Sequence, residues 1–253
     1  MWRTGTGTAV LLGLVVAGYA SAGRLASAGR PPHVHELITA DAALLGWWSG
    51  GRSPVVWLQS LGYEPGVVRW WDVLACLVYA SHFVAVMVVP LGLYLWDRDL
   101  ALGYVRMWLV LALVGVAVYL LYPAAPPWWA ARAGLIPAVS RISTHGWQGL
   151  NLPGVAELIS SGQGASNPIG AMPSLHAGAA LLAAVFFAPL IRRRWWPLLL
   201  LYPVSMALTL MYTGEHWFVD ILAGWAAVPM AYALVAWWDR LVPAKHDAPL
   251  SAT

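Results

Sequence analysis

Charged side chains are scarce in this chain of 253 residues: Asp, Glu, Lys and Arg together make up only 10% of it. A soluble domain has about 25% charged residues, so an ordinary soluble enzyme is disfavoured. Intrinsic disorder is excluded as well, because it requires low hydrophobicity and high charge, whereas 60% of these residues are hydrophobic. The composition therefore predicts an integral membrane protein.

Cysteine and phenylalanine are also rare. The single Cys76 excludes an internal disulfide and a thiol-rich metal site. There are 17 Trp against 4 Phe, and Trp favours the membrane–water interface. The net charge of +3 is not gathered into the basic face of a nucleic-acid-binding protein. We therefore expect membrane lipids as partners and no nucleic acid.

Six segments are long or apolar enough to cross a bilayer, which takes about 20 residues. They are 4–23, 73–96, 107–126, 174–191, 195–214 and 217–238. These segments predict an all-α, six-span helical bundle over residues 1–242, followed by a flexible tail at 243–253. The first segment is also compatible with a cleavable signal peptide, because Arg3 precedes an apolar run that ends at Ala20-Ser21-Ala22.

Basic residues near the span ends predict the orientation. With the N-terminus inside, the cytoplasmic pieces hold Arg3, Arg98, Arg106, Arg192, Arg193, Arg194, Arg240 and Lys245, and the longer outer pieces hold Arg24, Arg30, Arg52, Arg69, Arg132 and Arg141. The arginine triplet at 192–194 is the strongest signal. We expect a plasma-membrane protein with cytoplasmic termini. The outer segment 24–72 should carry interfacial helices, and 127–173 an ordered loop with one short helix.

Ionisable side chains at membrane depth are costly and mark candidate functional sites. His216 and Asp220 lie at the start of the last span, and a helix over 215–238 would place them on one face. Asp220 would then accept a hydrogen bond from one imidazole nitrogen and leave the other free as a base or nucleophile. The structural alternative is a His–Asp pair that only fastens two helices.

His176 follows Pro173 and Ser174, two residues that favour the beginning of a helix. The N-terminus of the fourth span would present unpaired backbone N–H groups and the positive end of the helix dipole, which suit a phosphate. The structural alternative is an interfacial histidine next to a capping serine.

His176 and His216 are 40 residues apart (216 − 176) with two spans between them. Two crossings of about 20 residues return the chain to the same membrane face, so both histidines should lie at the outer edge. This set favours phosphoryl transfer: His216 attacks phosphorus, Asp220 orients it, and His176 protonates the leaving oxygen. Ser174 and nearby backbone amides would hold the non-bridging oxygens.

Three motifs carry a family resemblance: MPSLH at 172–176, GEHWFVDILAG at 214–224 and YPAAPPW at 122–128. Together they resemble the type-2 phosphatidic acid phosphatase superfamily, and most nearly its inositol phosphorylceramide synthase-like branch, over residues 107–238. The resemblance implies a six-span helical bundle and a metal-independent phosphohistidine mechanism with no cofactor, in which His176, His216 and Asp220 have the roles above. Its members act on lipid phosphates or move a phospho-headgroup between lipids.

The chain departs from the broader superfamily in two places. It has no Lys/Arg-rich motif before the fourth span, and Leu210 stands where an Arg usually precedes the nucleophile by six residues. The phosphate charge must then be neutralised from elsewhere, and the candidates are Arg132 and Arg141, unless they only contact headgroups or loop carbonyls. Tyr122 and Glu215 are further substrate-binding candidates, with a solvated interfacial acid as the alternative for Glu215.

We therefore expect a single catalytic domain that acts as a lipid phosphatase or phosphotransferase on phospholipid or polyprenyl phosphates at the outer membrane face. Hydrolysis and transfer share one geometry, so both stay open. A non-enzymatic transporter or flippase of a phosphorylated lipid is a second hypothesis. A third is a zinc enzyme with the two histidines and Asp220 as ligands, although the metal motifs of such enzymes are missing. His82, within the second span, is expected to pack or hydrogen-bond between helices.

Overall fold

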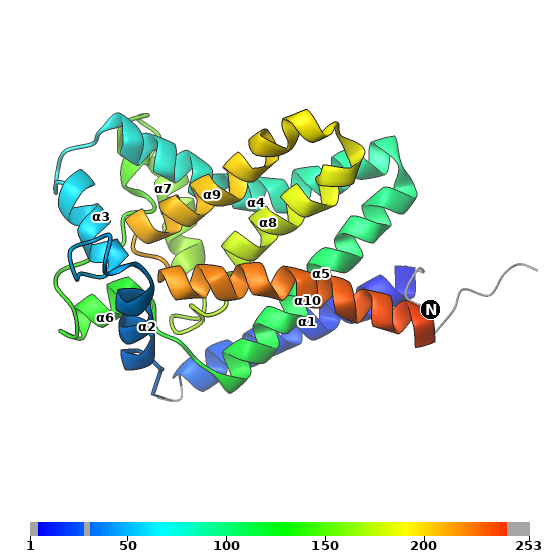
Figure 1. The fold of residues 1–253 in the computed structure, drawn as a ribbon, viewed down its shortest axis with the longest axis horizontal. Coiled ribbons are helices and arrows are strands. Elements are labelled where there is room, and N and C mark those ends of the chain that lie inside the picture. The colour runs from blue at the N-terminus through cyan, green and yellow to red at the C-terminus, as the bar shows by residue number, and fades with distance from the viewer. Residues whose placement is uncertain (1–4, 28–30, 242–253) are drawn as a thin grey trace, which may run out of the picture.

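The computed structural model describes residues 5–27 and 31–241. Six helices form a bundle (Figure 1): α1 (Gly5–Ser27), α4 (Trp70–Trp96), α5 (Arg98–Leu121), α8 (Leu175–Phe187), α9 (Trp196–Tyr212) and α10 (Phe218–Leu241). The connections carry α2 (His35–Leu45), α3 (Pro54–Gly62), α6 (Pro127–Arg132), α7 (Pro153–Gly164) and the short 3-10 helices η1 (His145–Gln148), η2 (Ala188–Leu190) and η3 (Arg193–Trp195). The predicted tail 243–253, together with Arg3, Arg30 and Lys245, lies outside the described residues.

Five of the bundle helices are long and apolar enough to cross a membrane: α1, α4, α5, α10, and α9 with the turn before it. Large apolar side chains such as Leu95 and Leu121 are more than three quarters exposed, which suits contact with lipid tails. The predicted helical membrane bundle is therefore confirmed. The apolar segment Leu175–Leu190 is shorter than the other five, so a sixth crossing there stays a prediction.

The third span lies earlier in the chain than predicted. The helix covers Arg98–Leu121 rather than 107–126, because the Asp97 carboxylate accepts hydrogen bonds from two backbone amides and caps the helix there. Arg106, which the hydropathy pattern placed outside the span, lies within the helix and pairs with Asp239 of α10 through two hydrogen bonds of 3.0 and 2.8 Å. Pro123 ends the helix, since it lacks the N–H that another turn would need.

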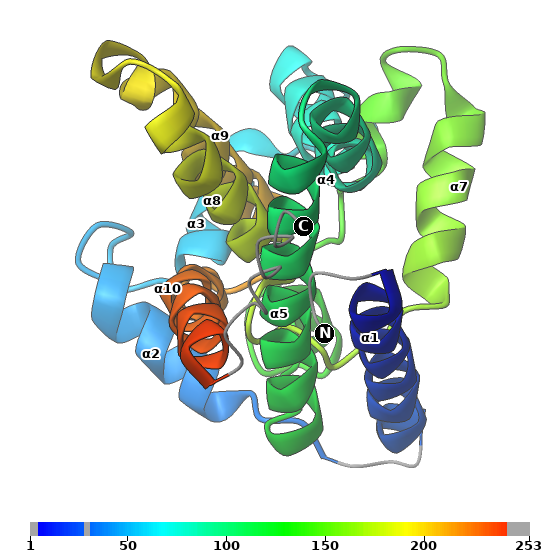
Figure 2. The same ribbon diagram turned by 90° about the vertical axis from the view of Figure 1, so that its right-hand side faces the viewer.

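The second outer loop contains more helix than predicted. Residues 127–173 form α6, η1 and α7, where one short helix was expected. Both α6 and α7 begin with a proline at the first helical position, where the missing N–H costs nothing. The glycines and serines of this segment suggested irregular structure, and these proline-started helices override them. In Figure 2, α7 lies at the edge of the bundle near α4 and α1.

Helices α8 and α10 approach each other through glycine. A side-chain Cβ at Gly224 would lie 2.2 Å from the Ser174 carbonyl oxygen, and one at Gly178 would lie 2.9 Å from the Gly224 carbonyl oxygen. Only a residue without a side chain lets the two backbones come this close. The contact places the N-terminal ends of α8 and α10 side by side, and these ends carry the predicted site.

Candidate active site

The MPSLH motif is held from two sides. Ser174 is the N-cap of α8 and its hydroxyl accepts a hydrogen bond from the Ala177 amide, as predicted from the sequence. Its own amide donates to the Asp220 carbonyl at 2.9 Å. From α5, the Tyr119 hydroxyl donates to the Pro173 carbonyl at 3.0 Å. The start of α8 is therefore fixed against both α10 and α5.

The YPAAPPW segment ties the other two motifs together. Ala124 donates to the Ile169 carbonyl and accepts from the Ala171 amide, which brings it beside the residues before MPSLH. The indole of Trp217, fully buried, donates to the Ala125 carbonyl at 2.8 Å. Three segments that are far apart in sequence thus form one buried corner of the bundle.

His216 and Asp220 are neighbours, with the imidazole Nδ1 3.5 Å from the carboxylate Oδ2. The helix does not begin at 215 as expected: α10 begins at Phe218, and His216 lies in the non-helical link between the turn at 213–214 and the helix. The reason is the conformation at Gly214, whose φ of +74° ends the preceding turn. Asp220 is fully buried and also accepts a hydrogen bond from the Trp217 amide at 2.9 Å. Nδ1 is thus the ring nitrogen next to the carboxylate, at an ion-pair distance and without a hydrogen bond within the described residues.

The two histidines meet as the spacing predicted. The ring centres of His176 and His216 lie 6.0 Å apart, and both rings line one cavity. Within the described part of the chain, the buried Nε2 of His176 has no hydrogen-bond partner. An unpaired buried nitrogen is costly, which is typical of a group reserved for a ligand or a proton transfer.

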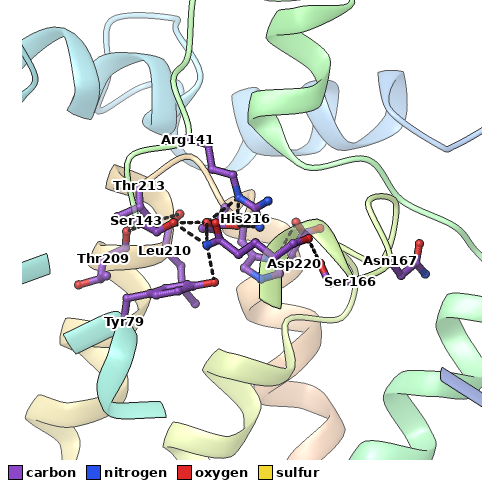
Figure 3. Close-up of polar contacts among 12 residues, drawn as sticks. Tyr79, Arg141, Ser143, Ser166, Asn167, Thr209, Leu210, Thr213, His216 and Asp220 are labelled. Atoms are coloured by element: carbon purple, nitrogen blue, oxygen red, sulfur yellow. Dashed lines mark hydrogen bonds and ion pairs between the residues drawn. The ribbon is translucent and has the colours of Figure 1, made fainter. Parts of the chain in front are cut away.

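Glu215 is not a solvated acid, one of the two alternatives for it, but a buried carboxylate at the centre of a polar network. Figure 3 shows polar contacts of this region, with Tyr79, Arg141 and Ser143 labelled. Its carboxylate accepts two hydrogen bonds from Nε of Arg141, at 2.9 and 3.1 Å, and one from Nη2 at 2.8 Å. The Ser143 hydroxyl donates to it at 2.5 Å. The Gln163 amide donates to Glu215, Ser143 and the Tyr79 hydroxyl.

Arg141 lines the cavity and keeps its charge there. Burial disfavours the charged guanidinium, but the hydrogen bonds and the negative charge of Glu215 outweigh this effect and raise the pKa of Arg141. Its guanidinium also lies over the ring of Trp128, 5.1 Å from the centroid, a favourable cation–π geometry. A fixed cation therefore faces the same space as the two histidines.

Of the remaining predicted site residues, Arg132 reaches the cavity, whereas Ser174 and Tyr122 do not. Arg132 lines the cavity from α6 and lies 5.3 Å from the Trp128 centroid, on the same ring as Arg141. Ser174 is fully buried and serves as the helix cap. Tyr122 stacks on His33 with ring centres 3.8 Å apart, and the structure brings neither Ser174 nor Tyr122 to the cavity wall.

The cavity has a volume of about 1440 Å³. Its polar lining includes the two histidines, Glu215 and three arginines, Arg24, Arg132 and Arg141, and most of its apolar lining comes from α1, α4 and α7, including Tyr19, Phe83, Val84, Met87, Leu158 and Ile159. This division suits a lipid with a charged headgroup, because the tail needs an apolar surface while the phosphate needs cations. We call this space the site cavity.

Metal ligation was the third hypothesis for the histidines and Asp220. Across residues 5–27 and 31–241, no three His, Cys, Asp or Glu side chains lie close enough together to hold an ion. The geometry therefore gives that hypothesis no support.

Three residues of the Glu215 network could not be recognised as site residues from the sequence. Tyr79, Ser143 and Gln163 come from α4, a loop and α7, and none lies in a motif or at a telling spacing. His82 did stand out as an ionisable group within a span, and the structure places it on the wall of the site cavity rather than only between helices.

Comparison with known proteins identifies the same family that the three sequence motifs resemble. The model of the PAP2 superfamily, the family of type-2 phosphatidic acid phosphatases, matches residues 34–234. The phosphoinositol dihydroceramide synthase of Bacteroides thetaiotaomicron is 29% identical over 171 residues, which cover 66% of this chain and 54% of that protein. The catalytic subunit of inositol phosphorylceramide synthase of Saccharomyces cerevisiae is 34% identical over 169 residues, covering 60% and 39%.

The inositol phosphorylceramide synthase of Candida albicans is 31% identical over 169 residues, covering 60% of this chain and 33% of that protein. The chain thus spans about a third to a half of the length of the curated relatives it matches. No solved structure matches. The names of these relatives support the inositol phosphorylceramide synthase-like branch. Since the family model covers most of its length, this chain belongs to the PAP2 superfamily.

Proposed function

We propose that this protein transfers or hydrolyses the phosphorylated headgroup of a membrane lipid through a phosphohistidine on His216. The observation that carries the proposal is the pairing of His216 with the buried Asp220 on the wall of a cavity that also exposes His176 and Arg141. A carboxylate beside Nδ1 fixes the tautomer and stabilises the cation that forms, while Nε2 stays free to attack.

The reaction needs two displacements at phosphorus. In the first, Nε2 of His216 bonds to phosphorus, the bond to the lipid oxygen breaks, and His176 gives that oxygen a proton. In the second, water or an alcohol gives its proton to His176 and its oxygen bonds to phosphorus, which releases Nε2. His176 returns to its starting protonation state, so no metal or other cofactor is required.

Arg141 is our candidate for the missing basic motif. Glu215 fixes its guanidinium through hydrogen bonds to Nε and Nη2, and the N–H groups not used in this way are available to non-bridging oxygens. Arg132 would assist from α6. Ser174 would contribute to substrate binding indirectly, as the cap that orients the backbone amides at the start of α8 toward the phosphate. Tyr122 would also contribute indirectly, as the first residue of the YPAAPPW segment.

Transfer is favoured over hydrolysis by the relatives, because those compared are synthases by name. We therefore propose a lipid alcohol as the preferred acceptor, with water as a competitor, and phospholipid or polyprenyl phosphates as donors. We place the site at the outer face of the plasma membrane and the termini in the cytoplasm. The arginine triplet supports this orientation, since it lies at the far ends of α8 and α9 from His176 and His216.

A panel of lipid phosphates and headgroup donors, each with and without lipid alcohols, tests the proposal when its products are identified by mass spectrometry. Wild-type protein should form product and a trapped phosphohistidine, and His216→Ala should form neither. Undiminished turnover by His216→Ala would contradict the mechanism. Lipid translocation that survives loss of both histidines, without turnover, would instead show a transporter or flippase.

A further inference from the structure

A third imidazole lies beside one of the two proposed catalytic histidines. The ring of His82, on α4, has its centre 4.2 Å from that of His176, which is in turn 6.0 Å from that of His216. All three side chains line the site cavity. The proposed mechanism uses only two of them, so the role of His82 is open.

One turn of α4 encloses His176. Tyr79 stacks on it with ring centres 5.2 Å apart, and Phe83 meets it edge-on at 5.6 Å. Residues 79, 82 and 83 share a face of the helix because they are three and four positions apart. The Tyr79 hydroxyl accepts a hydrogen bond from Gln163 at 3.1 Å, so this turn is joined to the Glu215 network. His82 therefore has a fixed position beside His176.

His82 lies at the boundary between the polar and apolar parts of the site cavity. One turn earlier along α4, Tyr79 belongs to the Glu215 network. Beyond His82, the side chains of α4 that line the cavity are Phe83, Val84 and Met87, and α4 has no further polar side chain before Tyr94. His82 is therefore the last polar group on α4 before a stretch suited to lipid tails.

A bound lipid phosphate has one oxygen at this boundary, because the oxygen that joins phosphorus to the lipid lies between the charged headgroup and the apolar tail. Building on the proposed function, we propose that His82 binds the oxygen of the acceptor lipid alcohol and holds it beside His176. In the second displacement the bond between phosphorus and Nε2 of His216 breaks, the bond to the acceptor oxygen forms, and the acceptor proton passes to His176.

His82 donates an N–H to the acceptor oxygen throughout this step and gains or loses no covalent bond. Water can reach phosphorus without such a contact, whereas a lipid alcohol must be held in one orientation. His82 therefore selects transfer over hydrolysis. The structure gives this role to a residue on α4, outside the three motifs that bear the proposed chemistry.

The test is the ratio of transfer to hydrolysis in the purified full-length protein. The donors are phosphatidic acid and phosphatidylinositol in mixed micelles, the acceptors are deuterated ceramide and deuterated diacylglycerol, and both products are counted by mass spectrometry. Both products arise from one phosphoenzyme, so its rate of formation cancels in the ratio. Loss of one hydrogen bond to the acceptor should shift the ratio about tenfold toward water.

The variants separate binding from packing. His82→Phe keeps an aromatic ring but loses the N–H donor and should shift the ratio toward water, whereas His82→Gln keeps a donor and should stay near the wild type. Phe83→Leu is the matched control: it also touches His176, has no donor to lose, and should lower both products together. If His82→Phe fails to fold, His82→Met removes the donor with a more flexible side chain.

Two results would overturn the inference. One is a ratio in the folded His82→Phe or His82→Met protein equal to that of the wild type. The other is a wild-type protein that uses only water whatever lipid alcohol is supplied. Turnover without any phosphoenzyme, or turnover by His216→Ala, would instead be a failure of the proposed function.

Discussion

The two walls of the site cavity are held in place by different means. One wall, which we call the backbone wall, is the start of α8 with His176; α10, which carries Asp220, lies behind it, and the two helices touch through their backbones, with glycine at positions 178 and 224. The other wall, which we call the side-chain wall, consists of α4, α7 and the loop at Arg141, which are joined by side chains that converge on Glu215. Backbone contact sets the distance between α8 and α10 directly, whereas α4, α7 and the loop at Arg141 are held by side-chain hydrogen bonds that a single substitution can remove.

The largest effect is expected from breaking the backbone wall. Gly224→Ala puts a Cβ 2.2 Å from the Ser174 carbonyl, and backbone cannot move aside as a flexible side chain can. Overpacking of this kind costs about 3 kcal/mol, and a shift of the histidines by about 1 Å costs about a hundredfold in rate. Thermal unfolding and kcat measure the two effects.

Gly92→Ala is the matched control for that substitution. Gly92 lies in α4, where a Cβ would meet nothing within 4 Å beyond its own stretch of helix backbone, so this change should leave kcat near the wild type and raise stability by at most about 1 kcal/mol through helix propensity. If Gly224→Ala behaved like Gly92→Ala, the close contact between α8 and α10 would not be what positions the site.

The next effect is expected on the side-chain wall from Arg141→Gln, which should slow the reaction to a similar extent but does not overpack the backbone. The substitution removes a guanidinium that Glu215 holds in the site cavity and leaves the buried Glu215 carboxylate without its charged partner. We expect kcat/KM for a lipid phosphate to fall about a hundredfold. Arg132→Gln should cost less, because within residues 5–27 and 31–241 Arg132 lies over Trp128 but, unlike Arg141, forms no ion pair with a carboxylate that would hold it in place. Equal losses in the two variants would contradict the role given to Arg141.

The same contrast explains which parts of the protein the sequence predicted. The motifs around His176 and His216 are continuous and their spacing matches two membrane crossings, so the meeting of the two rings followed from elementary geometry. The hydropathy pattern also found the helices, though it started the third span late because Arg106 interrupts the apolar run and is neutralised by Asp239. Charge pairing between distant helices has no local signature.

The side-chain wall could not be predicted in this way. Gln163 is one glutamine in a segment rich in glycine and serine, and only the folded chain shows that it meets Tyr79 and Glu215. His82 was visible as an isolated polar residue in a span, but its neighbour His176 lies 94 positions away (176 − 82). Such contacts depend on tertiary packing rather than on any periodicity.

A loss of about tenfold in activity is expected from Gln163→Ala. None of the residues of α7 is buried, and the Gln163 amide is the group that attaches this helix to Tyr79, Ser143 and Glu215. Without these hydrogen bonds, residues 153–164 should exchange their amide hydrogens faster, which mass spectrometry measures. Glu157→Ala, at an exposed position of the same helix, is the control. Unchanged exchange in Gln163→Ala would mean that α7 is held by other contacts.

The smallest effect concerns Asp41 of α2, which supports the backbone wall from outside. Its carboxylate is fully buried and accepts a hydrogen bond from the Val219 amide in the first turn of α10, at 3.0 Å. Burial raises the pKa of Asp41 to about 7, with a further contribution from the negative charge of Asp220, against the lowering effect of its hydrogen bonds.

The folded protein therefore holds a proton on Asp41 that the unfolded chain, with an ordinary carboxyl pKa, releases near pH 4. Stability from this group is fully present below that pH and is lost as the pH rises toward 7. The melting temperature of the wild type should fall by a few degrees between pH 5 and pH 8. Asp41→Asn keeps a hydrogen-bond acceptor for Val219 but cannot titrate, so its melting temperature should vary less across this range. An equally steep fall in Asp41→Asn would assign the pH dependence to another group and leave α2 without a part in it.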